Sequence, residues 1–102
     1  MKLYVDDMRS LPEDDPDCIC SRDYEDAIWQ LSIREYEYIS LDYDLGTSSL
    51  GNGLDILKWM SANGKYIPKI NIHSSHPIGV HMMKEFAENF FPSSVVTVHS
   101  LY

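Results

Sequence analysis

Four acidic residues stand in two close pairs, Asp6 with Asp7 and Asp42 with Asp44. Each pair closes a short run of apolar, β-favouring residues, KLYV before the first and YISL before the second. Four carboxylates gathered at one place would repel one another, and a hard divalent cation with oxygen ligands, Mg²⁺ or Mn²⁺, relieves that repulsion. The spacing therefore predicts a metal site at these four acids, provided that the fold brings the two pairs together.

A second group of residues with chemical potential is HSSH, residues 73–76, which also follows an apolar run. Imidazole titrates near neutrality and acts as general acid or base, hydroxyl groups bind phosphate oxygens, and the amides at the start of a following helix favour anions. Arg9, just after the first acidic pair, either clamps a phosphate or pairs with its acidic neighbours. The candidate catalytic residues are Asp42, His73 and His76, and the candidate ligand-binding residues are Arg9, Ser74 and Ser75.

The hydrophobic pattern predicts the elements that must position these residues. Apolar, β-rich runs predict strands over residues 2–6, 18–21, 38–42, 67–75 and 94–100. Helical spacing of apolar residues predicts three helices: one with a stripe from Tyr24 to Leu31, one over residues 54–62, and one that follows Pro77 with a stripe from Val80 to Phe90. The loop MRSLPEDDPD, residues 8–17, opposes a regular helix through its prolines, so the first connecting helix is expected to be missing or reduced.

Strands that alternate with short helices predict an α/β fold with right-handed crossovers. We expect a three-layer, flavodoxin-like sandwich in which helices cover both faces of a five-stranded, mostly parallel sheet of order 2-1-3-4-5. In that order, ligands bind where the strand order reverses, beyond the carboxyl ends of the first and third strands. The two acidic pairs end these two strands, so the expected topology brings all four carboxylates to one crevice.

Composition narrows the class of protein. A chain of 102 residues, 44% hydrophobic and 24% charged, fits one domain over residues 1–102. A net charge of −8, from 8 basic and 16 acidic residues, argues against bulk nucleic-acid binding, although a bound cation allows a small phosphorylated ligand. Without an apolar run long enough for a membrane span or a visible signal peptide, we expect a cytoplasmic location and no membrane partner. Cys18 and Cys20 are expected to be reduced thiols.

Three motifs resemble those of response-regulator receiver domains: VDD at the first strand end, LD at the third, and NGLDILKWM at a helix start. By that resemblance, Asp6 and Asp7 hold a metal, Asp42 occupies the phosphoacceptor position, and the backbone carbonyl of Asp44 completes the metal shell. The chain departs from receivers because its last strand, VVTVHS, contains no Lys, and its fourth strand ends in His and Ser. The resemblance thus implies a receiver-like fold and disfavours ordinary phosphotransfer signalling.

A narrower resemblance covers residues 3–87 through LYVDDMRSLP, ISLDYDLG, GLDILKWM and INIHSSHPIG. This set is similar to the cyclic-phosphate processing receiver domain family. The resemblance implies binding or hydrolysis of cyclic or otherwise phosphorylated nucleotides in conflict or nucleotide-signalling systems, and it adds Gly46 to the ligand-binding residues. Ser75 and His76 replace the small residue and the Asn that the family usually has after its His-Ser pair.

Two functions agree with these patterns. The first is a metal-dependent phosphodiesterase or phosphatase in which His73 or His76 protonates the leaving oxygen and Arg9 with Ser74 orients the phosphate. Attack by Asp42 or by an activated water both stay open. The alternative is a non-catalytic receiver-like module that binds a nucleotide or a protein partner, motivated by the missing last-strand Lys and the short chain; phosphoacceptor and homodimer variants also stay open.

Overall fold

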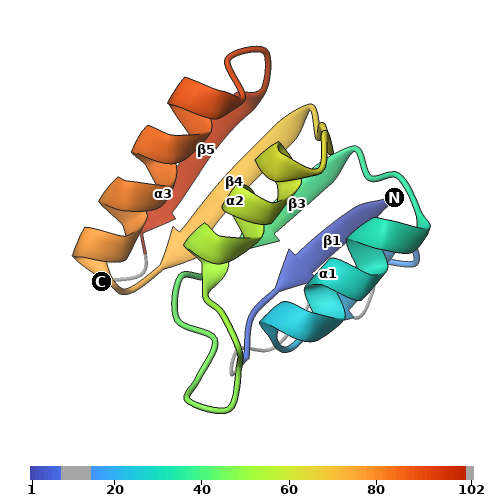
Figure 1. Cartoon of the computed structure of the whole chain (residues 1–102), viewed down its shortest axis with the longest axis horizontal. Coiled ribbons are helices and arrows are strands. Elements are labelled where there is room, and N and C mark those ends of the chain that lie inside the picture. Colours follow the sequence, from blue (N-terminus) through green and yellow to red (C-terminus); the bar gives the residue numbers. More distant parts are fainter. Residues whose placement is uncertain (8–14, 101–102) are drawn as a thin grey trace.

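The computed structural model describes residues 1–7 and 15–100, which form five strands and three helices. The strands are β1 (Lys2–Val5), β2 (Cys18–Ser21), β3 (Tyr38–Leu41), β4 (Lys69–Ser74) and β5 (Val95–Ser100). The helices are α1 (Tyr24–Ile33), α2 (Gly53–Ala62) and α3 (Pro77–Phe90). Both the number and the chain order of the predicted elements are confirmed, and Figure 1 shows the strands running side by side beneath the helices.

All strand pairs in the sheet are parallel, in the order β2-β1-β3-β4-β5. This is the predicted order. Each strand alternates between two kinds of side chain, so that Leu3 and Val5 are fully buried while Tyr4 between them is only partly buried. Because the strands pair in register, apolar residues of neighbouring strands share one face of the sheet and residues such as Tyr4 share the other.

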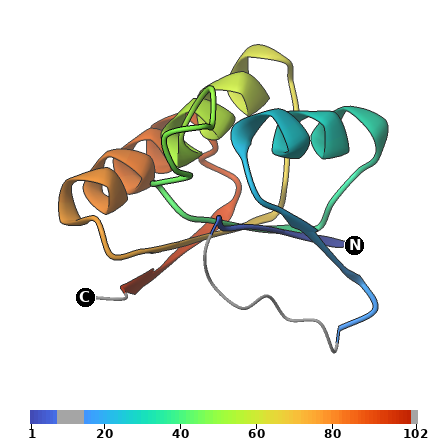
Figure 2. The same cartoon turned by 90° about the horizontal axis from the view of Figure 1, so that it is seen from below.

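All three helices lie on the same face of the sheet, as the edge-on view in Figure 2 shows. From β2 onward, each connection moves the chain in one direction across the sheet, to β3, β4 and β5. Right-handed crossovers made in one direction place their helices on one face. The expectation of three layers is therefore wrong for the described chain, which has two. Only the connection from β1 to β2 runs the other way, and residues 8–14 of it lie outside the described residues.

The hydrophobic core fills the space between the sheet and this single helical layer. Its fully buried side chains come from the helix-facing sides of β1, β3 and β4 and from the inner stripes of the helices. The largest of them are Leu3, Leu31, Ile39, Leu41, Ile56, Leu57, Met60, Ile67, Ile70, Ile72 and Met83. The helix stripes predicted from sequence periodicity thus correspond to the buried faces of α1, α2 and α3.

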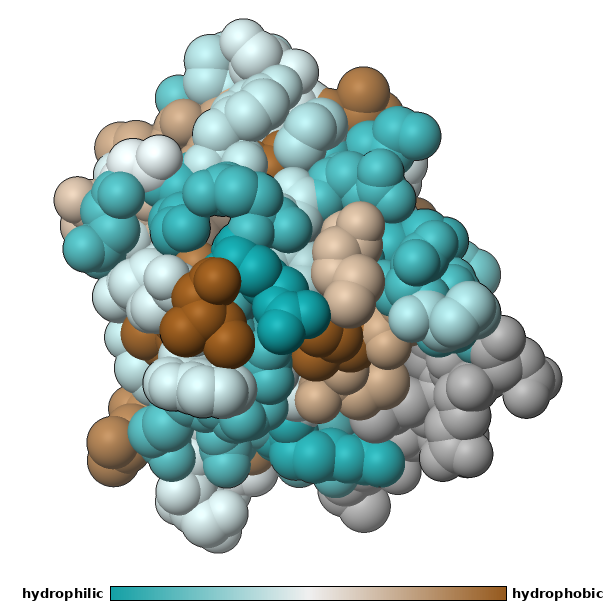
Figure 3. Space-filling model, turned by 90° about the vertical axis from the view of Figure 1, so that its right-hand side faces the viewer, coloured by the Kyte–Doolittle hydropathy of each residue, from teal (hydrophilic) through white to brown (hydrophobic). Residues whose placement is uncertain are grey.

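The outer surface around α1 mixes polar and apolar side chains. Figure 3 faces this side of the molecule, where hydrophobic residues form separate small patches among hydrophilic ones. Trp29 and Ile33 on α1 are about half exposed, at 58% and 48%. None of the helices within the described residues has the length and apolar character needed to cross a membrane.

The core predicts a clear contrast between two isoleucines. Ile70 is fully buried on β4, whereas Ile33 is 48% exposed at the end of α1. We expect Ile70→Ala to lower the free energy of unfolding by about 2–5 kcal/mol, because it removes buried methyl groups and leaves a cavity. Ile33→Ala should change it by no more than about 0.5 kcal/mol. Urea denaturation followed by circular dichroism measures both, and equal losses would contradict the assignment of the core.

Candidate functional site

The site lies where the carboxyl ends of three neighbouring strands meet, at the edge toward which the strand arrows in Figure 1 point. Asp6 follows β1, Asp42 follows β3, and His73 belongs to the last two residues of β4. Because these strands are adjacent and in register, one ligand atom from each of the three side chains lies within 4.8 Å of the others. Two carboxylates and one imidazole nitrogen thus share a single small region.

Asp6 and His73 form a buried polar pair. The Nε2 atom of His73 lies 3.0 Å from Oδ2 of Asp6, and the two residues are only 3% and 0% exposed. The ring of Tyr4 stacks on the imidazole with a centroid distance of 4.5 Å and an interplanar angle of 16°, which fixes the plane of the His73 ring. On the other side of the ring, Nδ1 lies 2.6 Å from Oγ of Ser40. Both ring nitrogens are therefore engaged.

Asp42 is partly buried beside this pair. Burial raises the pKa of its carboxyl group, and the negative charge of Asp6 raises it further, whereas a hydrogen bond from the Ser74 hydroxyl and the nearby His73 act in the opposite direction. The cost of holding two carboxylates here in a poorly hydrated place is relieved by a cation. The oxygen-rich donor set therefore fits a hard divalent ion, with Asp6 and Asp42 as its side-chain ligands.

The other two predicted metal ligands lie around Gly46. The positive φ of +87° suits a glycine at this position, where an added Cβ would also approach Oδ2 of Asp7 to 3.1 Å. The exposed carboxylate of Asp44 accepts a hydrogen bond from the Gly46 amide at 3.0 Å, and the Asp44 amide donates to Oδ1 of Asp42 at 3.3 Å. Within the described residues, the three-residue group is therefore Asp6, Asp42 and His73, and Asp44 supports it through its backbone.

The turn after β4 ties the site to the start of α3. The buried Ser74 hydroxyl lies near Asp42, whose pKa it lowers, and it accepts a hydrogen bond from the His76 amide at 3.2 Å. His76 is the N-cap of α3, since its Nδ1 accepts from the Gly79 amide at 2.9 Å. In the neutral ring this leaves the hydrogen on Nε2, and the residue as a whole is exposed. Ser75, between them, is exposed.

Tyr43 packs against the same turn, through contacts with His76 and Gly79. Its ring lies 4.7 Å from the His76 ring, at a tilt of 38°. The close fit depends on Gly79, because a Cβ at that position would come within 2.3 Å of the tyrosine ring. The residue after Asp42 thus packs against the first turn of α3, and this contact links the ends of β3 and β4.

The basic residue placed near Asp6 in the described chain is Arg22, which sequence reasoning did not select. Its Nη1 donates to the backbone carbonyl of Asp6 at 3.4 Å. The signal was available, because Arg22 directly follows β2, whose end adjoins that of β1 in the parallel sheet. Arg9, the predicted phosphate clamp, lies outside the described residues.

Two polar residues that lead to the Nδ1 side of His73, Ser40 and Asn71, were also not predicted from the sequence. Ser40 and Asn71 sit between apolar residues in YISL and KINIHS, on the face of the sheet opposite the helices. Asn71 donates to Oγ of Ser40 at 2.9 Å, and Thr97 of β5 donates to Oδ1 of Asn71 at 2.7 Å. The sequence contained a signal for them, because polar and apolar residues largely alternate along these two strands. This alternation places Ser40 and Asn71 on the same face of the sheet as His73.

The cysteines of β2 take no part in the site. Both are free, and burial together with the neighbouring Cys20 raises the pKa of the Cys18 thiol to about 11. A thiol with such a pKa carries little thiolate at neutral pH, so it is a poor nucleophile. The predicted reduced state agrees with this geometry.

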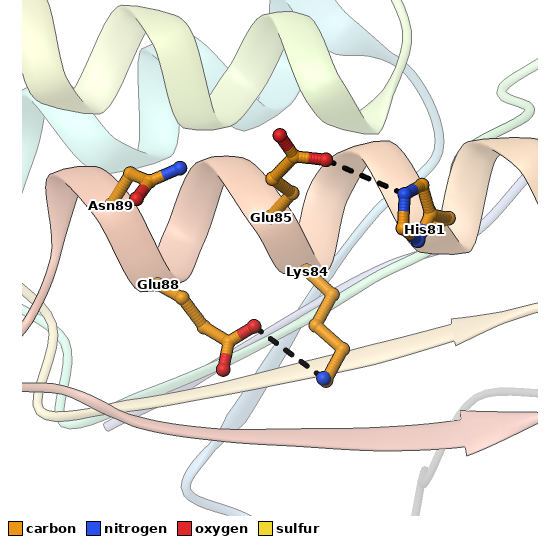
Figure 4. Close-up of a pocket in the computed structure, with 5 residues that line it drawn as sticks. All are labelled: His81, Lys84, Glu85, Glu88 and Asn89. Carbon is orange, nitrogen blue, oxygen red and sulfur yellow. Dashed lines mark ion pairs between the residues drawn. The ribbon is translucent and has the colours of Figure 1, made fainter.

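A shallow pocket of about 180 Å³ on α3 is a different kind of feature. It is lined by five exposed side chains of that one helix, and Figure 4 shows two i,i+4 ion pairs among them, His81 with Glu85 and Lys84 with Glu88. Exposed pairs of this kind contribute little free energy and typify a solvated helix surface. This pocket therefore gives no reason to place a binding site on the surface of α3.

Comparison with known proteins gives one match. A family model described as cyclic-phosphate processing receiver domain matches residues 1–89, which include every strand and turn that contributes to the site. Searches of curated proteins and of solved structures gave no significant match.

The raised pKa of Asp42 predicts a gain in stability when its charge is removed. A carboxyl group that binds its proton more tightly in the folded chain lowers the free energy of unfolding once the pH exceeds the usual Asp range, so its penalty is complete at neutral pH. Asp42→Asn keeps an acceptor oxygen without the charge. In metal-free buffer we expect it to unfold at a higher temperature than the wild type at neutral pH, with a difference that shrinks as the pH falls from the raised pKa of Asp42 to the usual Asp value.

Thermal unfolding followed by circular dichroism measures this difference, and Asp44→Asn, at the exposed neighbouring acid, is the control. A lower unfolding temperature for Asp42→Asn, or a gain that does not vary with pH, would contradict the electrostatic account.

The cap at His76 predicts that one acceptor atom matters for stability. His76→Ala removes the acceptor for the Gly79 amide and should lower the free energy of unfolding by about 0.5–2 kcal/mol. His76→Asn supplies a side-chain oxygen at the same helix start, and Asn is among the preferred N-cap residues, so it should recover most of that loss. Urea denaturation measures both variants. No loss in His76→Ala, or an equal loss in both variants, would contradict the assignment of this stability to the acceptor atom.

Proposed function

Because the chain belongs to the cyclic-phosphate processing receiver domain family, we propose that it is a metal-dependent phosphoric ester hydrolase that acts on a small cyclic or otherwise phosphorylated nucleotide. The observation that carries this proposal is the meeting of Asp6, Asp42 and His73 within 4.8 Å at one sheet edge. Buried carboxylates from adjacent strands are what a divalent-metal site requires.

The proposed metal ligands are Asp6 and Asp42, and the ion is Mg²⁺ or Mn²⁺. Asp7 and the carbonyl of Asp44 are further candidates on the loop side, as the family resemblance implies. When bound, such an ion neutralises the two carboxylates and polarises a phosphoryl oxygen. The bound ion would also reduce the electrostatic repulsion between an anionic ligand and the protein, whose net charge is −8.

Asp42 has two candidate roles in the chemistry. In the first route it would hold the metal while water attacks phosphorus, the ester P–O bond breaks, and the leaving oxygen takes up a proton. In the second route Asp42 would attack phosphorus itself with the same bond broken and the same proton uptake, and water would then hydrolyse the acyl phosphate to phosphate and free Asp42. In either route the Asp44 amide donates a hydrogen bond to Oδ1 of Asp42 at 3.3 Å, and the nearby Ser74 hydroxyl lowers the pKa of the same carboxyl group. The hydrogen bond from Asp44 favours one orientation of the carboxylate before a ligand arrives, which favours a reactive geometry.

The phosphate is proposed to bind between Arg22 and the start of α3. The guanidinium of Arg22 lies near Asp6 and offers donors that suit phosphate oxygens. His76 presents its Nε2 hydrogen to the ligand while Nδ1 remains on the Gly79 amide, so it serves as a hydrogen-bond donor to a phosphate or leaving oxygen. Ser75, exposed in the same turn, adds a hydroxyl group. Arg9 remains a candidate from the sequence.

The proposal predicts metal-dependent turnover that requires Asp42. Incubation of the protein with a panel of cyclic mono- and dinucleotides and Mg²⁺ or Mn²⁺ should give linear nucleotides or free phosphate, measured by chromatography and mass spectrometry. Asp42→Asn should lower the rate by more than the roughly 10–100-fold that is typical of residues that only support a metal ligand. Glu88→Gln, at an exposed acid on α3, should retain the wild-type rate.

Three different results would contradict the proposed hydrolase, and each points to a different conclusion. Thermal stabilisation by a nucleotide without any product after long incubation would replace the hydrolase with a binding module. Neither product nor stabilisation with any member of the panel would contradict the proposed function altogether. A mass increase after treatment with acetyl phosphate, lost in Asp42→Asn, would instead indicate a phosphoaccepting receiver.

A further inference from the structure

We propose that Ser40 and Asn71 are positioning residues, which hold the His73 ring in the tautomer that carries its hydrogen on Nε2. In that tautomer His73 donates a hydrogen bond to Asp6 and is not a metal ligand, although its nitrogen lies within reach of both carboxylates. The claim that the His73 hydrogen bond helps Asp6 to bind a metal rests on the proposed function. The claim about the His73 tautomer does not.

The basis is a row of polar side chains across the helix-free face of the sheet. Tyr4, Ser40, Asn71 and Thr97 occupy matched register positions on β1, β3, β4 and β5. Hydrogen bonds join Thr97 to Asn71 at 2.7 Å and Asn71 to Ser40 at 2.9 Å. From Ser40 the chain of bonds continues to Nδ1 of His73 at 2.6 Å and from Nε2 to Asp6 at 3.0 Å.

The direction of each bond in this chain can be assigned by starting from the buried carboxylate of Asp6. An ionised carboxylate only accepts hydrogen bonds, so the His73 Nε2 that faces Asp6 must carry a hydrogen. In a neutral ring Nδ1 is then an acceptor, and the Ser40 hydroxyl must donate to it. Because that hydroxyl hydrogen is used, Ser40 receives its remaining bond from the amide nitrogen of Asn71.

The outer end of the chain agrees with the same direction. With its nitrogen toward Ser40, Asn71 presents its oxygen to β5, where the Thr97 hydroxyl donates to it. Thr97, Asn71, Ser40 and His73 thus each donate one hydrogen bond toward the site, and the fully buried Asp6 accepts the last of them. The side-chain amide of Asn71 has its donor and its acceptor on different atoms, whereas the Ser40 hydroxyl donates and accepts through one oxygen.

The consequence concerns the kind of metal site. If Nε2 keeps its hydrogen, the metal is left with carboxylate and carbonyl oxygens, including the second oxygen of Asp6, and an all-oxygen site suits Mg²⁺ or Mn²⁺. A nitrogen ligand would instead favour metals such as Zn²⁺. The stacked ring of Tyr4 and the 3% exposure of His73 oppose the ring rotation that would release Nε2 from Asp6.

The first experiment measures the tautomer directly. In the metal-free wild-type protein, a long-range ¹H–¹⁵N NMR spectrum, with His73 assigned through His73→Gln, should show Nε2 protonated and Nδ1 unprotonated. In protein without added histidines, bound Mn²⁺ should show no directly coordinated ¹⁴N by electron spin-echo spectroscopy. A protonated Nδ1, or a ¹⁴N ligand that disappears in His73→Gln, would overturn the inference. If Mn²⁺ does not bind at all, the proposed function fails, while the tautomer result still decides the positioning claim.

The second experiment reverses the chain of bonds with an isosteric change. Asn71→Asp leaves only acceptor atoms opposite Ser40, so the Ser40 hydroxyl turns toward residue 71 and no longer donates to Nδ1 of His73. Since Nε2 still faces the Asp6 carboxylate and keeps its hydrogen, Nδ1 gains a second one and both ring nitrogens donate. We expect a protonated Nδ1 in this variant and a Mg²⁺ affinity lower by roughly 10–100-fold, as for other supporting residues. Thr97→Val, at the outer end, should keep the wild-type tautomer.

A purely structural role predicts an unchanged tautomer in both variants, and an unprotonated Nδ1 in Asn71→Asp would therefore overturn the claim. Circular dichroism checks that each variant is folded. If Asn71→Asp does not fold, the tautomer and the Mn²⁺ coordination of the wild-type protein remain decisive.

Discussion

The in-register pairing of β1, β3 and β4 is the constraint on which the rest of the molecule depends. These strands are parallel and adjacent, so their carboxyl ends lie at one edge, and residues far apart in sequence become neighbours there. Asp6, Asp42 and His73 meet for this reason alone. A slip of one residue in β4 would turn His73 toward the helices and move an apolar side chain beside the carboxylates. The apolar faces of the same strands prevent such a slip, because they are fully buried beneath the helices.

The handedness of the crossovers then divides the sheet into two faces with different tasks. Three successive right-handed connections in one direction place α1, α2 and α3 together, and the core is built on that side only. The opposite face is free of helices in the described chain, and it can carry side chains that a core would exclude. Ser40, Asn71 and Thr97 occupy it in one row and lead to His73. The site is thus supported from a face that contributes little apolar burial, which suits a polar network.

Electrostatics explains why the site is costly for the metal-free protein and why a bound cation would stabilise it. Asp6 is fully buried and Asp42 partly so, and burial together with mutual repulsion raises the pKa of Asp42. The His73 contact to Asp6 and the Ser74 contact to Asp42 offset part of that cost by donating to the carboxylates. A cation would remove most of the remainder. Functional sites commonly concentrate unfavourable charge in this way, and the surrounding core supplies the stability that tolerates it.

The sequence by itself determined the elements, the strand order and the residues that end the strands, because hydrophobic period, prolines and turn residues act locally and are readable in one dimension. It also supported the family resemblance through the motifs around Asp6, Asp42 and His73. Only the tertiary structure decided that the helices form one layer, that His76 caps α3, and that Asp7 and Asp44 lie around Gly46 while His73 joins Asp6 and Asp42. Which atoms meet depends on register, crossover direction and side-chain orientation, and these are fixed by contacts between residues that the sequence holds far apart.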